Sequence, residues 1–472
     1  MNLKMWNYVS LLIAAQILVG CGREQELVTF DESAVAAEAP EPSVVCRLIF
    51  QDHDTRKLRW THVLQGNPPK LDEIRDVAGF PVLDAERQNL VQMEAIQGTL
   101  LLGVRDDAGG TFQSGWVLVT TGVEEESHGD HGHWHFGEEP QIIAQQLDDQ
   151  QGNPAHLYIY QDVFYLANDR NSGYTRIDPA AIKGDEKSDV PQGFHAGGGH
   201  HITLAVVNNT TGYGTWIDGG GPNQGRVDVT RIRPDGNDEI AYSLTLPTGA
   251  IHGATTAADK VFFAPADGIC WVTADLDPTA EYADAEIHHI SLGVNPETKK
   301  PLRTGAFVTH RDYVCFVYGE EDYAALGLLN AHDAAPQLVS VSLPMQPGNS
   351  PTVPTIVKAA DGRRLAFVFH NHPGDIEGDE FLSIVDLDPN RDIDFSDASL
   401  LETIPVGHSA VEGHYGHHQI AFDDAGQFAF WTNPGDGTMS IMSLNDLRVL
   451  ATVPVGGKPT KVIALGAEDH GH

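Results

Sequence analysis

Residues 418–455 read HQIAFDDAGQFAFWTNPGDGTMSIMSLNDLRVLATVPV, which is four short β-rich runs separated by turn residues. The turns are Asp423-Asp424-Ala425-Gly426, Pro434-Gly435-Asp436-Gly437 and Asn445-Asp446. Runs rich in β-branched and aromatic residues between clusters of Gly, Pro, Asn and Asp are typical of antiparallel strands. Four strands in about forty residues is the size of one β-propeller blade, so this stretch predicts a blade.

The same pattern recurs along the chain, and helix patterns are scarce. Further units begin near Arg87, His156, His200, His252, Thr304 and Pro354. Residues 459–464 begin another unit without successors, and residues 47–50 and 57–60 could supply its missing strands. We therefore predict an all-β propeller of eight blades, closed by pairing of the N- and C-terminal strands. Seven blades is the alternative if the unit at Arg87 or at residue 459 is not independent, and a β-sandwich array is the competing fold.

The first residues are typical of an export signal. Lys4 precedes a mostly apolar stretch, residues 9–19, which is too short for a comfortable membrane span. Leu18-Val19-Gly20-Cys21 resembles a bacterial lipobox, so we expect residues 1–21 to be a lipoprotein signal peptide and Cys21 to be lipidated. The alternative is a signal peptide with an incidental cysteine. The mature protein is expected in the periplasm, anchored to a bacterial membrane through its N-terminal lipid only.

Composition bounds the rest of the chain. Residues 22–45 are rich in Glu, Ala and Pro and predict a disordered acidic tether, which leaves residues 46–472 for the propeller. The formal net charge of −37 argues against nucleic acid as a partner and favours a cation as ligand. Cys46, Cys270 and Cys315 are scattered without a C-x-x-C motif, so a thiolate zinc site is not expected. One disulfide with one cysteine left over is possible.

A histidine-rich stretch, Ser127-His128-Gly129-Asp130-His131-Gly132-His133-Trp134-His135, lies in a long predicted loop at residues 122–140. Neutral imidazole is the commonest metal ligand in proteins, and glycines keep such a loop mobile. We therefore predict His128, His131, His133 and His135 as metal ligands, with Asp130 as a secondary candidate. The alternative is a solvated polar loop with a histidine bias.

Blade topology predicts a second set of ligands. The start of each inner strand and the end of each second strand lie on the same face of a propeller. The candidates at these positions are His53, His156, His200, His252 and His418, with His201, His370, His372, His417 and Asp436 as further groups. Three or four of them could satisfy a tetrahedral zinc ion. The alternative for a lone histidine is packing and hydrogen bonding. The loop at residues 122–140 joins a third strand to a fourth, so it should open on the opposite face, either reaching around a blade edge or forming an independent, weaker site.

In several of its motifs the chain resembles the AztD family, the periplasmic zinc metallochaperones of the Azt-type zinc import system. Residues 128–135 look like the family's His-Gly-Asp-His-Gly-His-aromatic-His loop. The other similar motifs are Glu139-Pro140, Ile142-Ile143, Asp52-His53-Asp54-Thr55, His200-His201 and His252-Gly253.

The resemblance implies a propeller that binds Zn²⁺ and passes it to the zinc-specific periplasmic solute-binding protein of an ABC transporter. Imidazole sites also bind Cu²⁺ and Ni²⁺, which stay open as alternatives, whereas six methionines are few for a Cu(I) protein. The alternative functions are a metal-dependent propeller hydrolase or lactonase and a metal-free lipoprotein interaction scaffold. Neither an H-E-x-x-H motif nor a nucleophile elbow is found in the sequence, so we predict that the protein is not an enzyme.

Overall fold

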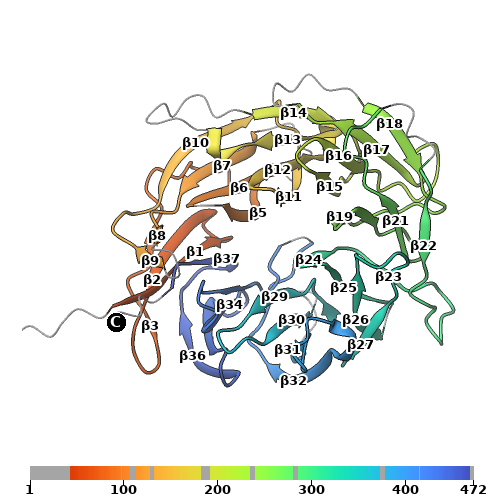
Figure 1. Cartoon of the computed structure of the whole chain (residues 1–472). Helices are drawn as coiled ribbons and strands as arrows, with labels where there is room; N and C mark the ends of the chain where they lie inside the picture. The colour runs from red at the N-terminus through yellow and green to blue at the C-terminus, as the bar shows by residue number, and fades with distance from the viewer. Residues whose placement is uncertain are drawn as a thin grey trace, which may run out of the picture. The chain divides into compact units, whose positions relative to one another are not determined.

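The computed structural model describes residues 43–96, 98–106, 113–127, 132–181, 192–233, 240–279, 285–320, 322–372, 378–413 and 415–467. These residues form an eight-bladed β-propeller, in which eight antiparallel sheets follow one another around a ring (Figure 1). The prediction of an all-β propeller with eight blades is confirmed, and the alternatives of seven blades and of a β-sandwich array are wrong.

Blades 1 to 4 occupy the first half of the ring. Blade 1 consists of β37 (Pro459–Leu465), β1 (Val44–Asp52), β2 (Lys57–Leu64), β3 (Lys70–Leu71) and β4 (Arg75–Asp76). Blade 2 consists of β5 (Gln88–Ile96), β6 (Thr99–Asp106), β7 (Ser114–Thr120) and β10 (Gln141–Asp148). Blade 3 consists of β11 (Pro154–Tyr160), β12 (Val163–Asn168), β13 (Gly173–Ile177) and β14 (Gln192–Ala196). Blade 4 consists of β15 (Leu204–Val207), β16 (Thr211–Thr215), β17 (Arg226–Arg231) and β18 (Ile240–Thr245).

Blades 5 to 8 complete the ring. Blade 5 consists of β19 (Ala254–Ala257), β20 (Lys260–Phe263), β21 (Ile269–Thr273) and β22 (His288–Ile290). Blade 6 consists of β23 (Arg303–Thr304), β24 (Val308–His310), β25 (Tyr313–Glu320), β26 (Tyr323–Asn330) and β27 (Val339–Leu343). Blade 7 consists of β28 (Ser350–Pro351), β29 (Thr355–Lys358), β30 (Arg364–Asn371), β31 (Phe381–Asp386) and β32 (Ser399–Pro405). Blade 8 consists of β33 (Ile420–Phe422), β34 (Phe428–Asn433), β35 (Thr438–Ser443) and β36 (Arg448–Pro454).

Helix is confined to short turns in the described residues. These are the 3₁₀ segments η1 (Asp169–Asn171), η2 (Pro179–Ala181) and η4 (Phe395–Asp397). None of the helices found there has the length and apolar character that a membrane crossing requires.

The two ends of the propeller meet in blade 1. Strand β37 supplies the inner strand and pairs antiparallel with β1, with Arg47 opposite Leu465 and Ile49 opposite Ile463. The sequence predicted this closure from the incomplete unit at residue 459. Because every sheet is then flanked on both sides, the apolar faces of blades 1 and 8 are both covered.

The core is divided among the spaces between neighbouring blades. Strand β1 shows why, because successive side chains of a strand point to opposite faces. Leu48 and Phe50 pack against Phe430 of blade 8, whereas Ile49 packs against Leu100 of blade 2. All five side chains are fully buried. A strand buried on both faces is largely apolar, so many second strands of the blades contain short apolar runs, such as Leu48-Ile49-Phe50 in β1.

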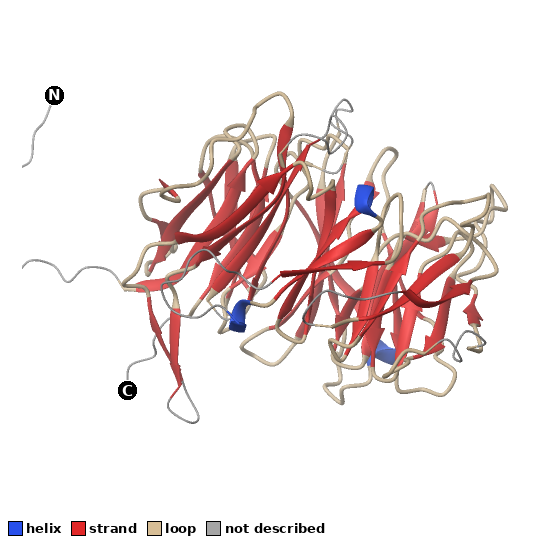
Figure 2. Ribbon diagram, turned by 90° about the horizontal axis from the view of Figure 1, so that it is seen from above, coloured by secondary structure: helices blue, strands red, loops and turns tan. Residues whose placement is uncertain are grey.

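The ring has two faces, which we call proximal and distal. The proximal face is the one on which the inner strands begin and the second strands end, and the distal face is the other. The loop that follows β7 therefore opens on the distal face. It contains a hairpin of its own, β8 (Glu124–Ser127) and β9 (Gly132–His135), which projects from the blades (Figure 2).

The root of this hairpin is held by one buried cation. Arg47 of β1 donates hydrogen bonds to the carbonyl oxygens of Thr121 (2.7 Å), Phe136 (2.9 Å) and Glu138 (2.6 Å). A Cβ on Gly466 would lie 2.6 Å from the ring of Phe136, so the hairpin's aromatic root packs closely on the end of β37. The described part of the loop therefore stays on the distal face.

The three cysteines of the propeller are free and buried. Cys46 lies on β1, Cys270 on β21 and Cys315 on β25, in three different blades. The disulfide that their number left possible is therefore not formed. Burial raises the pKa of each thiol, that of Cys270 to about 12, so the thiols stay protonated at neutral pH.

The first turn of blade 8 contains a buried carboxyl group. Asp423 accepts hydrogen bonds at Oδ1 from the backbone N–H groups of Gln427 (2.8 Å) and Phe428 (2.6 Å), while its Oδ2 is buried without a partner. Burial raises the pKa of Asp423 to about 6, although these two hydrogen bonds oppose the rise. An acid whose pKa is higher in the folded state stabilises the fold at low pH, and this contribution is lost as the pH rises through the folded value.

We expect Asp423→Asn to stabilise the protein at high pH. The amide keeps the acceptor for both N–H groups and carries no charge to bury. With a folded pKa of about 6 and an unfolded value near 3.8, the gain over the wild type should grow by about 2 kcal/mol between pH 4 and pH 8. Urea unfolding at the two pH values measures it, and an equal gain at both would contradict the raised pKa.

Candidate metal centre

Three histidines from consecutive blades meet on the proximal face. His156 of blade 3, His201 before blade 4 and His252 before blade 5 each offer a ligand nitrogen, and these three atoms lie within 4.8 Å of one another. The Nε2 atoms of His156 and His201 are 2.9 Å apart. The ring of His252 stacks on that of His201 with centroids 5.0 Å apart. We call these residues the three-histidine cluster.

The spacing fits a metal ion of zinc's size. Two nitrogens bound tetrahedrally at about 2.05 Å lie about 3.3 Å apart, so the cluster needs shifts of a few tenths of an ångström up to about 1.5 Å to enclose one ion. All three rings are half-buried. Three protein nitrogens leave a fourth tetrahedral position free for water or for a ligand from another molecule.

Local backbone features place each imidazole. The pairing of β11 with β12 is irregular between Pro154 and Leu157, and a bulge of this kind re-aims a side chain, here His156. His201 follows the run Gly197-Gly198-Gly199. A Cβ at Gly199 would lie 2.4 Å from the ring of Trp216, so only glycine lets the chain pass this close before it turns into β15.

Hydrogen bonds from outside the cluster fix the two stacked rings. His201 donates from Nδ1 to Asp169 Oδ2 at 3.1 Å, and the backbone N–H of Ile202 donates to Oδ1 of the same carboxylate at 3.0 Å. His252 donates from Nδ1 to the carbonyl oxygen of Gly305 at 2.9 Å. Because these oxygens accept, the proton sits on Nδ1 and the lone pair is on Nε2. At His201 this lone pair accepts a hydrogen bond from Nε2 of His156, so a metal ion would take the place of that proton. An oxygen that accepts from the second ring nitrogen is the usual partner of a metal-binding histidine.

One cluster imidazole is held in the neutral form that a cation requires. Burial lowers the pKa of His252 and outweighs the hydrogen bond to Gly305, which raises it. Only the deprotonated nitrogen of an imidazole binds a metal ion, so a lowered pKa reduces competition by protons.

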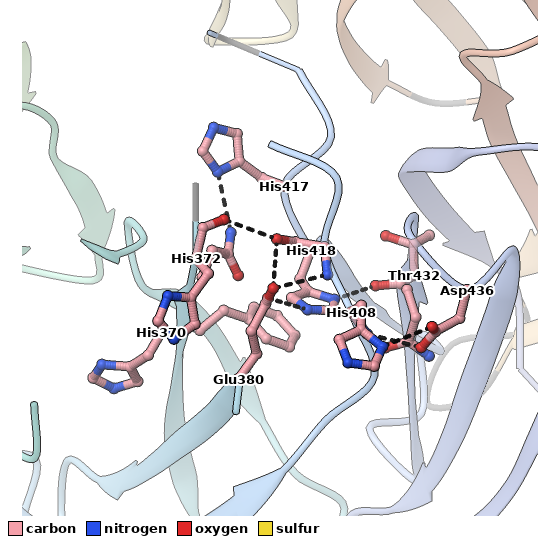
Figure 3. Close-up of polar contacts among 12 residues, drawn as sticks. His370, His372, Glu380, His408, His417, His418, Thr432 and Asp436 are labelled. Carbon is pink, nitrogen blue, oxygen red and sulfur yellow. Dashed lines mark hydrogen bonds and ion pairs between the residues drawn. The ribbon is translucent and has the colours of Figure 1, made fainter. Parts of the chain in front are cut away.

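The predicted ligand His418 is used differently. Its ring is buried, with Nδ1 2.6 Å from the carbonyl oxygen of Thr432 and Nε2 2.9 Å from Oε2 of Glu380 (Figure 3). Both nitrogens face acceptors, so neither offers a lone pair. Burial by itself raises the pKa of Glu380, but its hydrogen bonds with His418 and Ser409 bring that pKa below the usual value. His418 and Glu380 therefore form a structural pair between blades 7 and 8.

Other predicted histidines also lie outside the cluster. His370 is fully buried, stacks on Phe381 and contacts the hydroxyl of Ser383 at 2.9 Å. Burial lowers its pKa to about 4. His372 is buried nearby, and Figure 3 shows both beside Glu380.

The remaining candidates of the proximal face have polar or aromatic partners of their own. His417 accepts a hydrogen bond from Asn371. His53 stacks on Tyr415 with centroids 4.9 Å apart. His200 binds Asp218 rather than the cluster, and Asp436 binds His408. The physical reason is the same throughout: a rim position brings an imidazole to the proximal face, but only side-chain direction decides whether it joins its neighbours.

The histidine-rich hairpin lies on the distal face, away from the cluster. His133 is opposite Glu126 and His135 opposite Glu124, so both histidines share one side of the ribbon with two carboxylates. His135 Nε2 lies 3.2 Å from Glu126 Oε2. The other predicted ligands here, His128, Asp130 and His131, lie outside the described residues, as does the lipidation candidate Cys21.

Two parts of the candidate centre escaped the sequence. Asp169 belongs to no motif, yet it directly follows a second strand, close to the position that singled out Asp436, so the topology could have found it. Of the doublet His200-His201, we predicted His200 as the main ligand and His201 as a secondary candidate, whereas the structure places His201 in the cluster. The carbonyl of Gly305 leaves no sequence signal at all, because any residue has one.

Comparison with known proteins agrees with the fold. No protein-family model and no curated protein sequence matches the chain. Among solved structures, Citrobacter koseri AztD aligns with 91% of this chain and all of its own at 13% identity, with a TM-score of 0.59. Apo AztD from the same organism aligns with 90% of this chain and 99% of its own at 14% identity and a TM-score of 0.57. The designed protein Ika8 covers 86% of this chain and 98% of its own at 14% identity and a TM-score of 0.50.

At these identities the matches establish the fold. The chain is an eight-bladed β-propeller with a three-histidine candidate metal centre on one face. Its fold is that of AztD.

We expect Asp169→Asn to weaken zinc binding by about 10- to 100-fold, the usual effect of losing a carboxylate that orients a metal-binding histidine. The amide no longer holds the proton of His201 on Nδ1 as firmly, so the Nε2 lone pair is less available. Competition with a chromophoric chelator measures the affinity. Asp436→Asn is the matched control, because Asp436 holds an imidazole outside the cluster. Equal affinities for Asp169→Asn and wild type would contradict the role of Asp169.

Proposed function

We propose that this protein is a zinc-binding metallochaperone that passes Zn²⁺ to the zinc-specific solute-binding protein of an ABC importer. The observation that carries the proposal is the convergence of His156, His201 and His252, whose ligand nitrogens lie within 4.8 Å of one another while outer hydrogen bonds orient two of the rings. The fold of AztD supports the same conclusion.

The chemistry of the cluster suits transfer better than permanent storage. Its ligands are imidazoles, which release a metal ion without having to bind a proton, unlike thiolates. The rings are half-buried, so an incoming ligand can reach the ion. The free fourth position lets a partner's side chain bind before the first histidine leaves. The net charge of −37 attracts the cation to the protein in the first place.

Catalysis by the same centre is the alternative function. Three histidines with an open position also occur in hydrolytic zinc enzymes, which add a general base beside the metal-bound water. The group found among the described residues consists of imidazoles alone. This composition favours a carrier. Imidazole nitrogens also accept Cu²⁺ and Ni²⁺, so those ions are the alternative cargo.

The proposal includes the location of the protein. Cys21 is the lipid attachment site, and the propeller works in the periplasm at the membrane surface. The tether is shorter than the predicted residues 22–45, because Val44 and Val45 already belong to β1. The histidine-rich hairpin is a second, weaker zinc site. Its position on the distal face allows it to bind zinc independently of the three-histidine cluster.

Calorimetric titration with zinc, combined with metal analysis by mass spectrometry, tests the main site. We expect wild type to bind at sub-micromolar Kd, and His252→Gln to weaken this site by at least about 100-fold, since a ligand should count for more than its outer partner. His332→Gln, an exposed histidine elsewhere, is the control. A wild type that binds zinc only at millimolar concentration would refute the proposed function.

A separate variant tests the hairpin. Replacing His128, His131, His133 and His135 together with glutamine should remove the weaker site and slow transfer to a zinc solute-binding protein, while the tight site and the melting temperature stay as in wild type. The readouts are calorimetric stoichiometry and the rate of transfer. Unchanged stoichiometry together with an unchanged rate would contradict the role given to the hairpin.

A further inference from the structure

Blade 3 contains a cavity that the metal centre does not use. Its volume of about 390 Å³ is within the range of small-molecule sites, which is about 300–1,000 Å³. The walls are the turn between β10 and β11, the end of β12 with η1, and strands β13 and β14. The residues that line it are Gln150, Gln151, Asn168, Asn171, Thr175 and Phe194. None of these six carries a charge, so the cavity suits a neutral ligand better than an ion, whose charge would stay unpaired there.

Asn168 lines the cavity with an unpaired acceptor. The residue is 1% exposed, and its Nδ2 donates to Oγ1 of Thr175 at 2.7 Å, while its Oδ1 is buried without a partner. Asn168 is the N-cap of η1. In this position an asparagine usually accepts a hydrogen bond from the first turn of the helix, but the Asn168 side chain does not. A buried acceptor without a partner destabilises the fold, so this oxygen calls for a donor from outside the chain.

Further amides complete the polar walls. Asn171 donates from Nδ2 to the carbonyl oxygen of Gln150 at 2.7 Å and so ties the turn after β12 to the turn before β11. The Nε2 groups of Gln150 and Gln151 donate to Asp149 (2.9 Å) and Asp148 (3.4 Å), which leaves their Oε1 atoms as acceptors. Together with the unpaired oxygen described above, the cavity is rich in acceptors. It therefore matches a ligand that carries several donors.

Phe194 adds an apolar surface to the same cavity. It lies on the outer strand β14, opposite Thr175 of β13, and is 42% exposed. A Cβ at Gly173 would lie 2.4 Å from Cζ of Phe194, so the ring can lie against β13 only because residue 173 is glycine. The aromatic ring is thus held in place beside the amides, and it offers a ligand an apolar contact.

We propose that this cavity binds the pyranose ring of a sugar, either free or as part of a glycan. A pyranose has C–H groups on its faces, which contact the ring of Phe194, and hydroxyl groups around its edge, which donate to amide oxygens. A hydroxyl that donates to Oδ1 of Asn168 satisfies the buried acceptor. The inference is independent of the proposed function, because none of the lining residues belongs to the three-histidine cluster.

The test titrates the full chain, without zinc, with glucose, N-acetylglucosamine, maltose and N,N′-diacetylchitobiose. Saturation-transfer NMR detects binding, and calorimetry gives the Kd. We expect at least one of these sugars to bind with a Kd of about 1 mM or below. Phe194→Ala should weaken binding at least about fivefold, and Asn168→Leu should abolish it. Leu401→Ala is the matched control, because Leu401 is 44% exposed on the outer strand of blade 7. Tighter binding of a disaccharide identifies a glycan as the source, and equal binding of its monosaccharide identifies a free sugar.

Three results would overturn the proposal. The first is that none of the four sugars binds at about 20 mM. The second is that Phe194→Ala binds as tightly as wild type, because the sugar would then lie elsewhere. The third is that ethanolamine, a small cation, binds in place of the sugars and is lost in Phe194→Ala. Melting temperatures show that each variant is folded, and Phe194→Ala decides if Asn168→Leu does not fold.

Discussion

The pairing of β37 with β1 is the interaction on which the rest of the structure depends. Each blade buries its apolar faces only against its neighbours, so an open ring would leave one face of blade 1 and one of blade 8 in water. Pairing of Arg47 to Phe50 with the last strand closes the ring, so both of these faces are covered. It also fixes the positions of the inner strands around the ring, and this brings rim residues of blades 3, 4 and 5 to one point.

Histidines on the proximal face serve two opposite purposes. Where one nitrogen donates to an oxygen and the other lies near the nitrogens of neighbouring imidazoles, as in His201 and His252, the imidazole keeps a lone pair for a cation. Where both nitrogens meet acceptors, as in His418, the imidazole joins two blades and neither nitrogen is free to bind a metal ion. Residue type and strand position are the same in the two cases, and the outer partner decides between them.

The cluster lies on the proximal face and the hairpin on the distal face, where Arg47 fixes the root of the hairpin. The same guanidinium that sits in the closing strand binds carbonyl oxygens on both sides of the hairpin. Under the proposed function the protein has two zinc sites. One is a half-buried centre with oriented ligands, and the other is a projecting hairpin in which His133 and His135 lie opposite Glu126 and Glu124. A ligand that is oriented in advance loses less freedom on binding, so the cluster is the tighter of the two.

The sequence by itself determined the architecture, because a short strand period and turn residues repeat at a fixed spacing and the incomplete last unit requires partners from residues 47–60. It also placed the candidate histidines on one face, since strand parity follows from topology. Only the tertiary structure decided which imidazoles meet. A bulge turns His156 inward, a glycine run against Trp216 selects His201 over His200, and Asp169 and the Gly305 carbonyl arrive from other turns. These choices depend on side-chain direction and on contacts distant in sequence, which a repeat pattern does not encode.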